Sequence, residues 1–391
     1  MVSKPFYCIW IVVFSFFESN AQQYTITIKN NLSFSRVEII AIPRKVLLPL
    51  IAQNPGYVIG ISPQDGKGFE TTQWIDNNID GIADELLFLI EIAANSTVVY
   101  TISAVKEFVT VTPVGITFSR FVPERSDDYA WENNKVAFRA YGPKGQEEAL
   151  KGVAGSTLSS GIDIWLKRTN YPVIDNWYKK NTETPGYYHT DHGEGYDPYH
   201  VGVSRGVGGI GIWENGNLLV SDNFISYKTI AVGPLRTVFE LTYASWSNHE
   251  VTETKRITLD LYSNFSKFEV SLTAKNEVPN YTIGLTTHEN KGNPKLNKKN
   301  GWFRYWEKID DAFVGEGIVV NPQCINSAFA NVTQVQDQSN ILVLTKPSEK
   351  LVYYAGFAWQ KSGDVKIIED WDAMLEKQAA IIANPLEVQI K

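Results

Sequence analysis

Short runs of alternating apolar and polar residues follow one another through roughly the first third of the chain. They are rich in β-branched and aromatic residues, and turn-forming residues separate them: YTITIKN, RVEIIAI, ELLFLIEI, STVVYTISAV and GITFSRF. A period of two places every second side chain on one face, as half-buried strands require. The pattern predicts an immunoglobulin-like antiparallel sandwich over residues 23–123.

Longer alternating runs in the second half indicate a larger sandwich. They include RTVFELTYASW and VTETKRITLDLYSNFSKFEVSLTAKN, and Asn215-Gly216 between two apolar runs is typical of a hairpin. Near the end, IEDWDAMLEKQAAII has a helical period and PLEVQI returns to a strand pattern. We therefore predict an all-β chain whose second, catalytic domain over residues 124–391 is a sandwich of the galactose-mutarotase type (a supersandwich) with a C-terminal helix.

Residues 1–22 predict a secretory signal peptide. Lys4 precedes the apolar run FYCIWIVVFSFF, which is too short to span a bilayer, and ESNAQQ offers small and polar residues for cleavage. A retained anchor is the alternative. We expect a secreted, periplasmic protein with no membrane span once the signal is removed. The mature chain would keep one cysteine, Cys324, so a large core and no internal disulfide must stabilise it.

The charge of the chain narrows the class of partner. A net charge of −7 and a sequence pI near 5.4 argue against nucleic acid, because phosphate binding needs a basic surface. An anionic oligosaccharide is still compatible, since a pocket can concentrate cations locally. The basic loop KGNPKLNKKNGW is interpreted as a solvated excursion or, alternatively, as a contact for an anionic ligand. The sequence does not predict an oligomeric state.

One loop in the N-terminal region has the spacing of calcium ligands. DNNIDGIADELLF places oxygen-bearing side chains at positions one, three, five and nine, but Leu87 replaces the glutamate expected at position twelve. We predict a structural Ca²⁺, with a plain Asx-rich turn as the alternative. The predicted ligands are Asp76, Asn78, Asp80 and Asp84. No organic cofactor is expected, because GVGGIG continues into a strand pattern and no phosphate-binding or dinucleotide motif is found in the sequence.

The densest chemistry lies in the segment from Tyr187 to Gly206, YYHTDHGEGYDPYHVGVSRG, which holds three of the five histidines. Crowded ionisable groups resist burial unless they are paired, and Gly and Pro interrupt regular structure, so this segment is interpreted as a site. Three chemistries stay open: proton transfer, a metal held by His189 and His192 with His200 or Asp191, and an opposed carboxylate pair as in glycoside hydrolases. The carboxylate candidates are Asp191 with Glu194 or Glu132.

A β-elimination at a uronic acid needs a base for the proton α to the carboxylate, a clamp on that carboxylate and an acid for the departing oxygen. Histidine, arginine and tyrosine supply these roles, and the segment holds all three. The predicted catalytic residues are the bases His189 or His192, the acids Tyr188 or Tyr196, and the clamp Arg205. The predicted substrate-binding residues are Trp131 as a stacking face, the cations Arg139, Lys167 and Arg168, the orienting acids Asp191 and Glu194, and His200.

The alternation in KVAFRAY places Arg139 and Tyr141 on the non-core face of a strand, where they would line a cleft or form a solvated salt bridge. The sequence leaves open whether His249 and His288, far along the chain, fold back onto the histidine-rich segment.

Four blocks resemble the secreted bacterial family catalogued as domain of unknown function 4861. They are SDDYAWENNKVAFRAYGP, GIDIWLKRTNYPVIDNWY, YYHTDHGEGYDPYHVGVSRGVGGIGIW and VGPLRTVFELTY, and the likeness covers nearly the whole mature chain. The resemblance implies breakdown of marine algal polysaccharides, since a member of the family resembles an ulvan-oligosaccharide dehydratase. The implied reaction removes water from the non-reducing-end glucuronate or iduronate beside sulfated rhamnose and leaves a 4,5-unsaturated uronate.

Three alternatives to dehydration stay open: a glycoside hydrolase, a polysaccharide lyase that cleaves the glycosidic bond, and a non-catalytic carbohydrate-binding protein.

Overall fold

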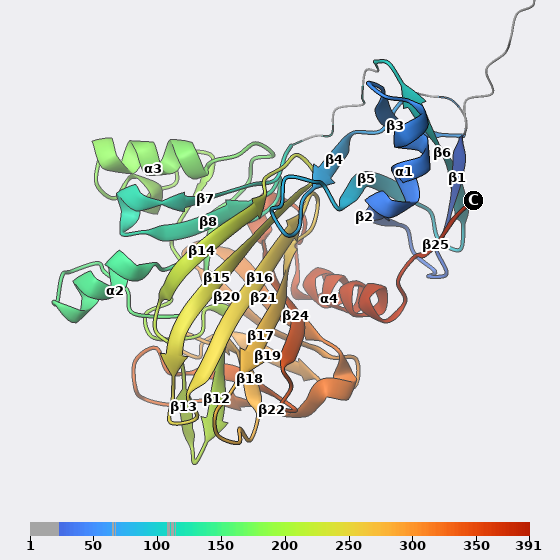
Figure 1. Ribbon diagram of the computed structural model, residues 1–391. Coiled ribbons are helices and arrows are strands. Elements are labelled where there is room, and N and C mark those ends of the chain that lie inside the picture. The colour runs from blue at the N-terminus through green and yellow to red at the C-terminus, as the bar shows by residue number, and fades with distance from the viewer. Residues whose placement is uncertain (1–22, 65, 67, 108–109, 111–112, 114) are drawn as a thin grey trace, which may run out of the picture.

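The computed structural model describes residues 23–391 except 65, 67, 108–109, 111–112 and 114. It shows a small N-terminal unit beside a much larger one, and both are built mainly of antiparallel strands (Figure 1). The all-β prediction is therefore confirmed. The predicted signal peptide lies outside the described residues. Within the described ranges, no helix is long and apolar enough to cross a membrane.

The N-terminal unit is a sandwich of two sheets around a core of isoleucine, leucine and aromatic side chains. One sheet has the order β25 (Glu387–Ile390), β1 (Tyr24–Lys29), β6 (Thr97–Val105) and β3 (Val58–Pro63). The other has the order β2 (Arg36–Pro43), β5 (Glu85–Ile92) and β4 (Thr72–Ile75). The helix α1 (Arg44–Gln53), which the strand pattern did not predict, buries Leu47 and Leu50 in this core.

Two boundaries differ from the prediction. The chain's last strand, β25, pairs with β1 and so belongs to the N-terminal sandwich. Strand β7 (Phe118–Val122), in contrast, lies before the expected boundary at residue 123 but pairs with β8 (Asp128–Glu132) of the large unit.

The large unit contains one wide sheet and two narrower sheets. The wide sheet has the order β14 (Phe224–Ala231), β15 (Arg236–Trp246), β16 (Val251–Asp260), β17 (Phe265–Thr273), β24 (Lys350–Trp359), β21 (Ala312–Val320), β20 (Trp302–Ile309) and β19 (Asn293–Asn297). A five-stranded sheet, the site sheet, has the order β11 (Gly195–Tyr196), β10 (Asp163–Lys167), β9 (Ala137–Ala140), β8 (Asp128–Glu132) and β7 (Phe118–Val122). The other five-stranded sheet has the order β13 (Asn217–Leu219), β12 (Val207–Glu214), β18 (Tyr281–Thr286), β23 (Asn340–Thr345) and β22 (Ile325–Asn331).

One continuous apolar core joins the wide sheet to both narrower sheets. Strand β16 illustrates why this sequence forms the wide sheet, because its residues alternate between buried and partly exposed along the whole strand. The hairpin predicted at Asn215-Gly216 joins β12 to β13, and both residues have the positive φ that such a turn needs. The basic segment interpreted as a solvated loop instead contains β19, an edge strand that pairs with β20.

Helices cover parts of the outer surface of the large unit and leave β14–β16 uncovered (Figure 1). The predicted C-terminal helix is present as α4 (Ile368–Ala383), and its Trp371 and Leu375 pack on the wide sheet. Helix α3 (Ile174–Glu183) packs Trp177 and Tyr178 on the outer face of the site sheet. A shorter helix, α2 (Pro143–Leu150), follows β9.

Candidate active site

The histidine-rich segment crosses the edge of the site sheet. It begins with a 3-10 turn, η2 (Tyr187–His189), and then forms β11, which pairs with β10. Gly195 has a φ of +121°, and a Cβ there would lie 2.0 Å from the carbonyl oxygen of Leu166, so only glycine permits this close approach. The segment is thereby held against the sheet, and Asp197 reaches its outer face.

A buried arginine lies at the centre of this outer face, between three buried carboxylates. Arg139 Nη2 lies 2.5 Å from Asp163 Oδ2 and donates a 3.0 Å hydrogen bond to Asp197 Oδ2. Its Nε lies 3.9 Å from Asp128 Oδ2. The rings of Trp165 and Tyr188 pack at 5.4 and 5.7 Å from the guanidinium carbon. Arg139 therefore faces a closed polar network, and not the open cleft or solvated edge that the alternation suggested.

Burial governs the protonation of this network. It raises the pKa of Asp128 to about 6, against the opposing charges of Arg139 and Arg125. Burial also raises the pKa of Asp163, and burial together with the charge of Asp163 raises that of Asp197 well above its usual value. Perturbed carboxyls of this kind cluster at functional sites, because a fold retains such costly groups where they have a task.

The raised pKa of Asp128 predicts a pH-dependent stability. The unfolded chain binds this proton with a pKa near 3.8 and the folded chain with a pKa of about 6, so the stabilisation by the protonated form is lost as the pH rises through that window. An asparagine at position 128 cannot ionise, so the Asp128→Asn protein should not lose this stabilisation as the pH rises. Between pH 4 and pH 7, we expect the variant's free energy of unfolding to improve relative to wild type by on the order of 2 kcal/mol. Urea unfolding at pH 4 and pH 7 measures the free energy of unfolding of both proteins. The same difference between variant and wild type at both pH values would contradict the prediction.

His189 lies over this network with one ring nitrogen fixed. Its Nδ1 is 2.7 Å from the backbone oxygen of Asp197 and 3.8 Å from that residue's carboxylate. A carbonyl oxygen only accepts, so Nδ1 carries the proton in the neutral ring and Nε2 keeps its lone pair. The side chain is 55% exposed, which makes that lone pair accessible to a ligand. This arrangement suits a general base that acts through Nε2.

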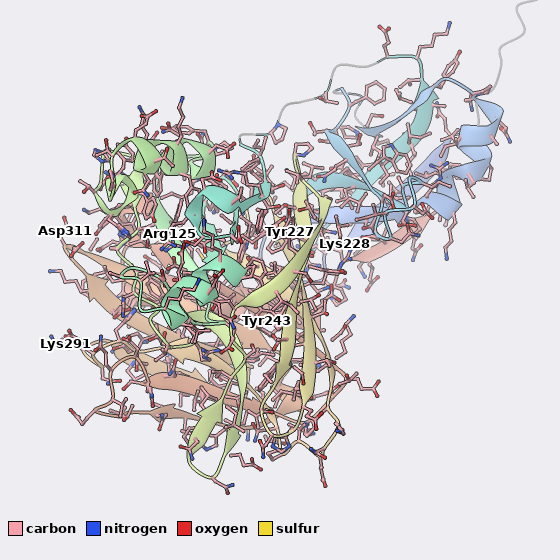
Figure 2. All side chains as sticks on the ribbon, turned by 60° about the vertical axis from the view of Figure 1, so that its left-hand side comes forward. Arg125, Tyr227, Lys228, Tyr243, Lys291 and Asp311 are labelled. Atoms are coloured by element: carbon pink, nitrogen blue, oxygen red, sulfur yellow. The ribbon has the colours of Figure 1, made fainter. Side chains whose placement is uncertain are left out.

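Tyr188 and an arginine complete the group beside His189. Arg125 lies in the short turn η1 (Pro123–Arg125), and its Nε donates a 3.2 Å hydrogen bond to Tyr188 Oη. The Tyr188 ring stacks on Trp165 and meets the His189 ring edge-on at 4.5 Å between centroids. Arg125 lies well apart from the N-terminal unit (Figure 2). We call Arg125, Tyr188 and His189 the outer triad.

The remaining acids and histidine of the segment have local partners. Asp191 pairs with Arg168 at 2.8 Å, and Glu194 accepts hydrogen bonds from the Tyr171 hydroxyl and the Trp177 indole. His192 is exposed and stacks on Tyr187 at 4.0 Å. Asp191 and Glu194 thus fasten the segment to the sheet and to α3.

Several predicted site residues lie in the interior. Trp131 is fully buried and donates to Ser266 Oγ, so it offers no stacking face to a sugar. Lys167 is buried and forms a 2.6 Å ion pair with Glu132, which in turn accepts hydrogen bonds from the backbone where α3 begins. This pair leaves neither Lys167 for a substrate nor Glu132 for a hydrolytic carboxylate pair.

Two further predicted catalytic side chains are occupied by protein groups. Arg205 is buried, donates to Ser160 Oγ at 2.9 Å and to backbone oxygens, and burial lowers its pKa to about 10. A substrate carboxylate would have to displace these contacts. Tyr196, on β11, is buried and donates to Asp310 Oδ2, in the turn between β20 and β21, at 2.6 Å.

The far end of the segment borders a cavity of about 800 Å³. His200 lines it, exposed and 3.0 Å from Asp337. His288 also lines it, which shows that this distant histidine does fold back onto the segment: its Nε2 is 2.8 Å from the backbone oxygen of His200 and its Nδ1 is 2.5 Å from Glu307. Burial disfavours the charged ring, but Glu307 outweighs burial and raises the pKa of His288. His249 instead pairs with Glu214.

The predicted metal ligands show the geometry of an Asx turn. Asp76 accepts backbone hydrogen bonds from Ile79 and Gly81, each at 2.7 Å, and Asn78 and Asp84 likewise cap backbone amides. Across the described residues, no group of three or more His, Cys, Asp or Glu side chains converges as a metal site. The calcium ion stays a prediction, because carboxylates that accept amide hydrogen bonds keep further lone pairs.

The sequence prediction missed Arg125 and the three acids of the network. Asp128, Asp163 and Asp197 come from three different strand ends, so their spacing along the chain carries no signal. Arg125 stands in the polar run ERSDD, whose composition is that of a solvated turn, and only the fold shows the contact of Arg125 with Tyr188 and the burial of Asp128.

The chain is similar to known proteins over nearly its whole length. A model of the family described as domain of unknown function (DUF4861) matches residues 28–388. A protein of Formosa agariphila, described as uncharacterized protein P7, is 41% identical over 379 residues, which cover 96% of this chain and 95% of the relative. A solved protein in glycosyl hydrolase family 38 from Enterococcus faecalis has a TM-score of 0.52 at 10% identity, over 96% of this chain and 48% of that one. The chain spans about half the length of that solved protein, and the likeness shows a shared fold.

Proposed function

Since the chain belongs to the DUF4861 family, we propose that it is a secreted, periplasmic carbohydrate-active enzyme that removes water from a terminal uronic acid. The substrate class is a short ulvan-type oligosaccharide with glucuronate or iduronate at its non-reducing end. The product is a 4,5-unsaturated uronate. The outer triad supports this reaction because it brings together the three kinds of side chain that such an elimination needs.

The reaction assigns one role to each member of the outer triad. His189 Nε2 takes the proton from C5, and the electron pair of that bond forms the C4–C5 double bond. The C4–O bond breaks, and Tyr188 donates its hydroxyl proton so that the oxygen leaves as water. Arg125 holds the uronate carboxylate, onto which negative charge spreads as the C5 proton leaves.

The observation that carries the proposal is the pairing of the Tyr188 hydroxyl with Arg125 directly beside a histidine whose Nδ1 is tied to the backbone. The resemblance to a glycosyl hydrolase family 38 structure is consistent with action on a carbohydrate, but that fold serves many chemistries.

The test uses the mature protein and uronate-terminated ulvan oligosaccharides. We expect a rise in ultraviolet absorbance from the conjugated product and a mass loss of one water without shortening of the chain. Shortening with new unsaturation would identify a lyase that cleaves glycosidic bonds, and shortening without unsaturation would identify a glycoside hydrolase. Affinity without any turnover would identify a binding protein.

Replacement of the proposed acid tests its role separately from the fold. Tyr188→Phe keeps the ring that stacks on Trp165 and removes only the hydroxyl. We expect kcat to fall by roughly 10²-fold or more, as for loss of a general acid. The melting temperature should fall by only a few degrees, because Arg125 Nε loses one hydrogen-bond acceptor. Tyr187→Phe, on the neighbouring residue, is the matched control and should keep its activity. Full activity of the Tyr188→Phe enzyme would remove this tyrosine from the mechanism.

A further inference from the structure

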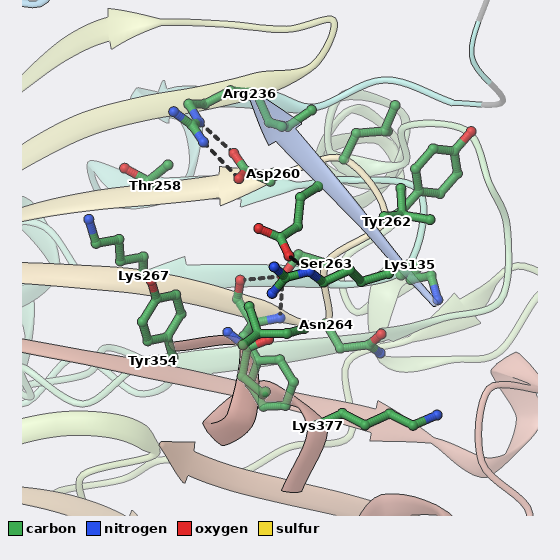
Figure 3. Close-up of a pocket in the computed structure, with 18 of the residues that line it drawn as sticks. Lys135, Arg236, Thr258, Asp260, Tyr262, Ser263, Asn264, Lys267, Tyr354 and Lys377 are labelled. Carbon is green, nitrogen blue, oxygen red and sulfur yellow. Dashed lines mark hydrogen bonds and ion pairs between the residues drawn. The ribbon is translucent and has the colours of Figure 1, made fainter. Parts of the chain in front are cut away.

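A second large cavity lies between the two units, away from the outer triad. This interdomain groove has a volume of about 740 Å³ and is lined by the N-terminal unit, the wide sheet and α4. That volume is within the roughly 300–1,000 Å³ of small-molecule sites. Figure 3 shows Lys135, Lys267 and Lys377 at separate points around it, with Tyr354 near Lys267.

Basic side chains outnumber acidic ones in the lining of the groove, six to four. Four of the six, Lys135, Arg236, Arg256 and Lys267, form ion pairs with acids in or beside the groove. Attraction of an anionic ligand therefore rests on the two other cations, Arg36 and Lys377.

A buried arginine in the groove is incompletely paired. The side chain of Arg36 is 2% exposed, its Nη1 donates to the backbone oxygen of Asn384, and its Nε faces Glu38 at 3.0 Å. Its Nη2 has no hydrogen-bond partner within the described part of the chain. A buried guanidinium nitrogen without an acceptor is costly, so it marks the place where a ligand oxygen would bind.

The neighbours of Arg36 satisfy its guanidinium only in part. Burial raises the pKa of Glu38, against the charge of Arg36, which lowers it, and Arg36 Nε and Glu38 Oε1 face each other at 3.0 Å without a hydrogen bond. Lys377, on α4, lies 5.7 Å over the Phe34 ring and forms no ion pair with the residues that the structure describes. The half-buried ring of Tyr354 offers an apolar face of the kind on which sugar rings stack.

We propose that the interdomain groove is a second binding site for an anionic saccharide, whose sulfate or carboxylate group pairs with Arg36 and Lys377. The proposal rests on the proposed function, since that function supplies the anionic oligosaccharide. The groove would hold a part of the oligosaccharide that does not react, because the groove lies on the side of the large unit that faces the N-terminal unit.

The test is calorimetric titration of the full chain with a sulfated uronate oligosaccharide, the same oligosaccharide after desulfation, and inorganic sulfate. We expect Lys377→Glu to weaken the affinity for the sulfated oligosaccharide about tenfold and to leave kcat on a short substrate unchanged. Lys179→Glu, an equally exposed lysine on α3, is the control and should bind like wild type. Arg36→Lys keeps the charge but loses the planar fork, and it should weaken binding as well.

Unchanged affinity of the Lys377→Glu and Arg36→Lys proteins would overturn the proposal, as would inorganic sulfate binding as tightly as the oligosaccharide. The two proposals fail separately. If binding depends on Lys377 but no dehydration is detected, the binding site in the groove is supported and the proposed enzyme activity is rejected. If dehydration is detected but binding does not depend on Lys377, only the binding site in the groove is rejected.

Discussion

His189→Ala should abolish dehydration while the protein stays folded. The expected fall in kcat is about 10²–10⁴-fold, the usual contribution of a general base. The reason is geometric: the hydrogen bond of Nδ1 to the Asp197 carbonyl fixes the tautomer, so Nε2 is the nitrogen that holds the lone pair. The side chain is mostly exposed, so little packing is lost and the melting temperature should change by only a few degrees. Single-turnover measurement of the ultraviolet absorbance gives the rate of the chemical step.

His192→Ala is the matched control for this result. His192 is exposed and stacks on Tyr187, three residues from His189 in the same segment. Its loss should leave kcat within about threefold of wild type, because surface substitutions of this kind act weakly. An active His189→Ala protein together with an inactive His192→Ala protein would transfer the role of base to His192.

Arg139→Met should destabilise the fold severely. Methionine is an apolar side chain of similar length, so it fills the space but leaves the buried Asp128, Asp163 and Asp197 without their common cation. Removal of one partner from a buried ion pair costs about 3–5 kcal/mol, and we expect a loss of that size in the free energy of unfolding at pH 7.5. Denaturant unfolding followed by tryptophan fluorescence measures it.

The pH dependence separates charge from packing. Without Arg139 the pKa values of the three carboxyls rise further, and acids with a raised pKa in the folded state destabilise it increasingly as the pH rises. The loss should therefore be larger at pH 8 than at pH 4.5. Arg168→Met is the control, since the Arg168–Asp191 pair is partly exposed and should cost about 1 kcal/mol or less. An equal loss for Arg139→Met at both pH values would assign the effect to packing.

Hydrophobic periodicity was sufficient to predict many of the strands of this protein, but not how they pair into sheets. The two-residue alternation of β5 and β16 and the helical period of α4 are strong local signals, and each appears close to its predicted place. Helix α1 was missed because RKVLLPLIAQ is short and contains Pro49, so its apolar residues fit a strand as well as a helix. The position of β25 could not be predicted, since strand pairing across the whole chain leaves no local pattern.

The candidate site was predicted in part. The density of ionisable residues identified the segment that carries Tyr188, which is also buried, and His189, but it gave equal weight to side chains whose polar atoms are occupied by other protein groups. Arginine and tryptophan are residue types that often bind sugars, so Arg205 and Trp131 were predicted to bind the substrate. Only the tertiary structure shows that Arg205 already donates a hydrogen bond to Ser160 and Trp131 to Ser266. Arg125 was overlooked for the opposite reason, because its importance comes from one contact 63 positions away.

The pairing of β25 with β1 has a consequence for how the protein is made. During synthesis β1 emerges among the first residues of the described chain, whereas the partner on one of its edges emerges among the last. N-terminal domains commonly fold first on the ribosome. The small sandwich cannot do so completely, because one edge of β1 has no partner strand until β25 has been made. Its closure waits until β25 has been synthesised, so the small sandwich lacks one edge strand while the whole of the large unit is being made.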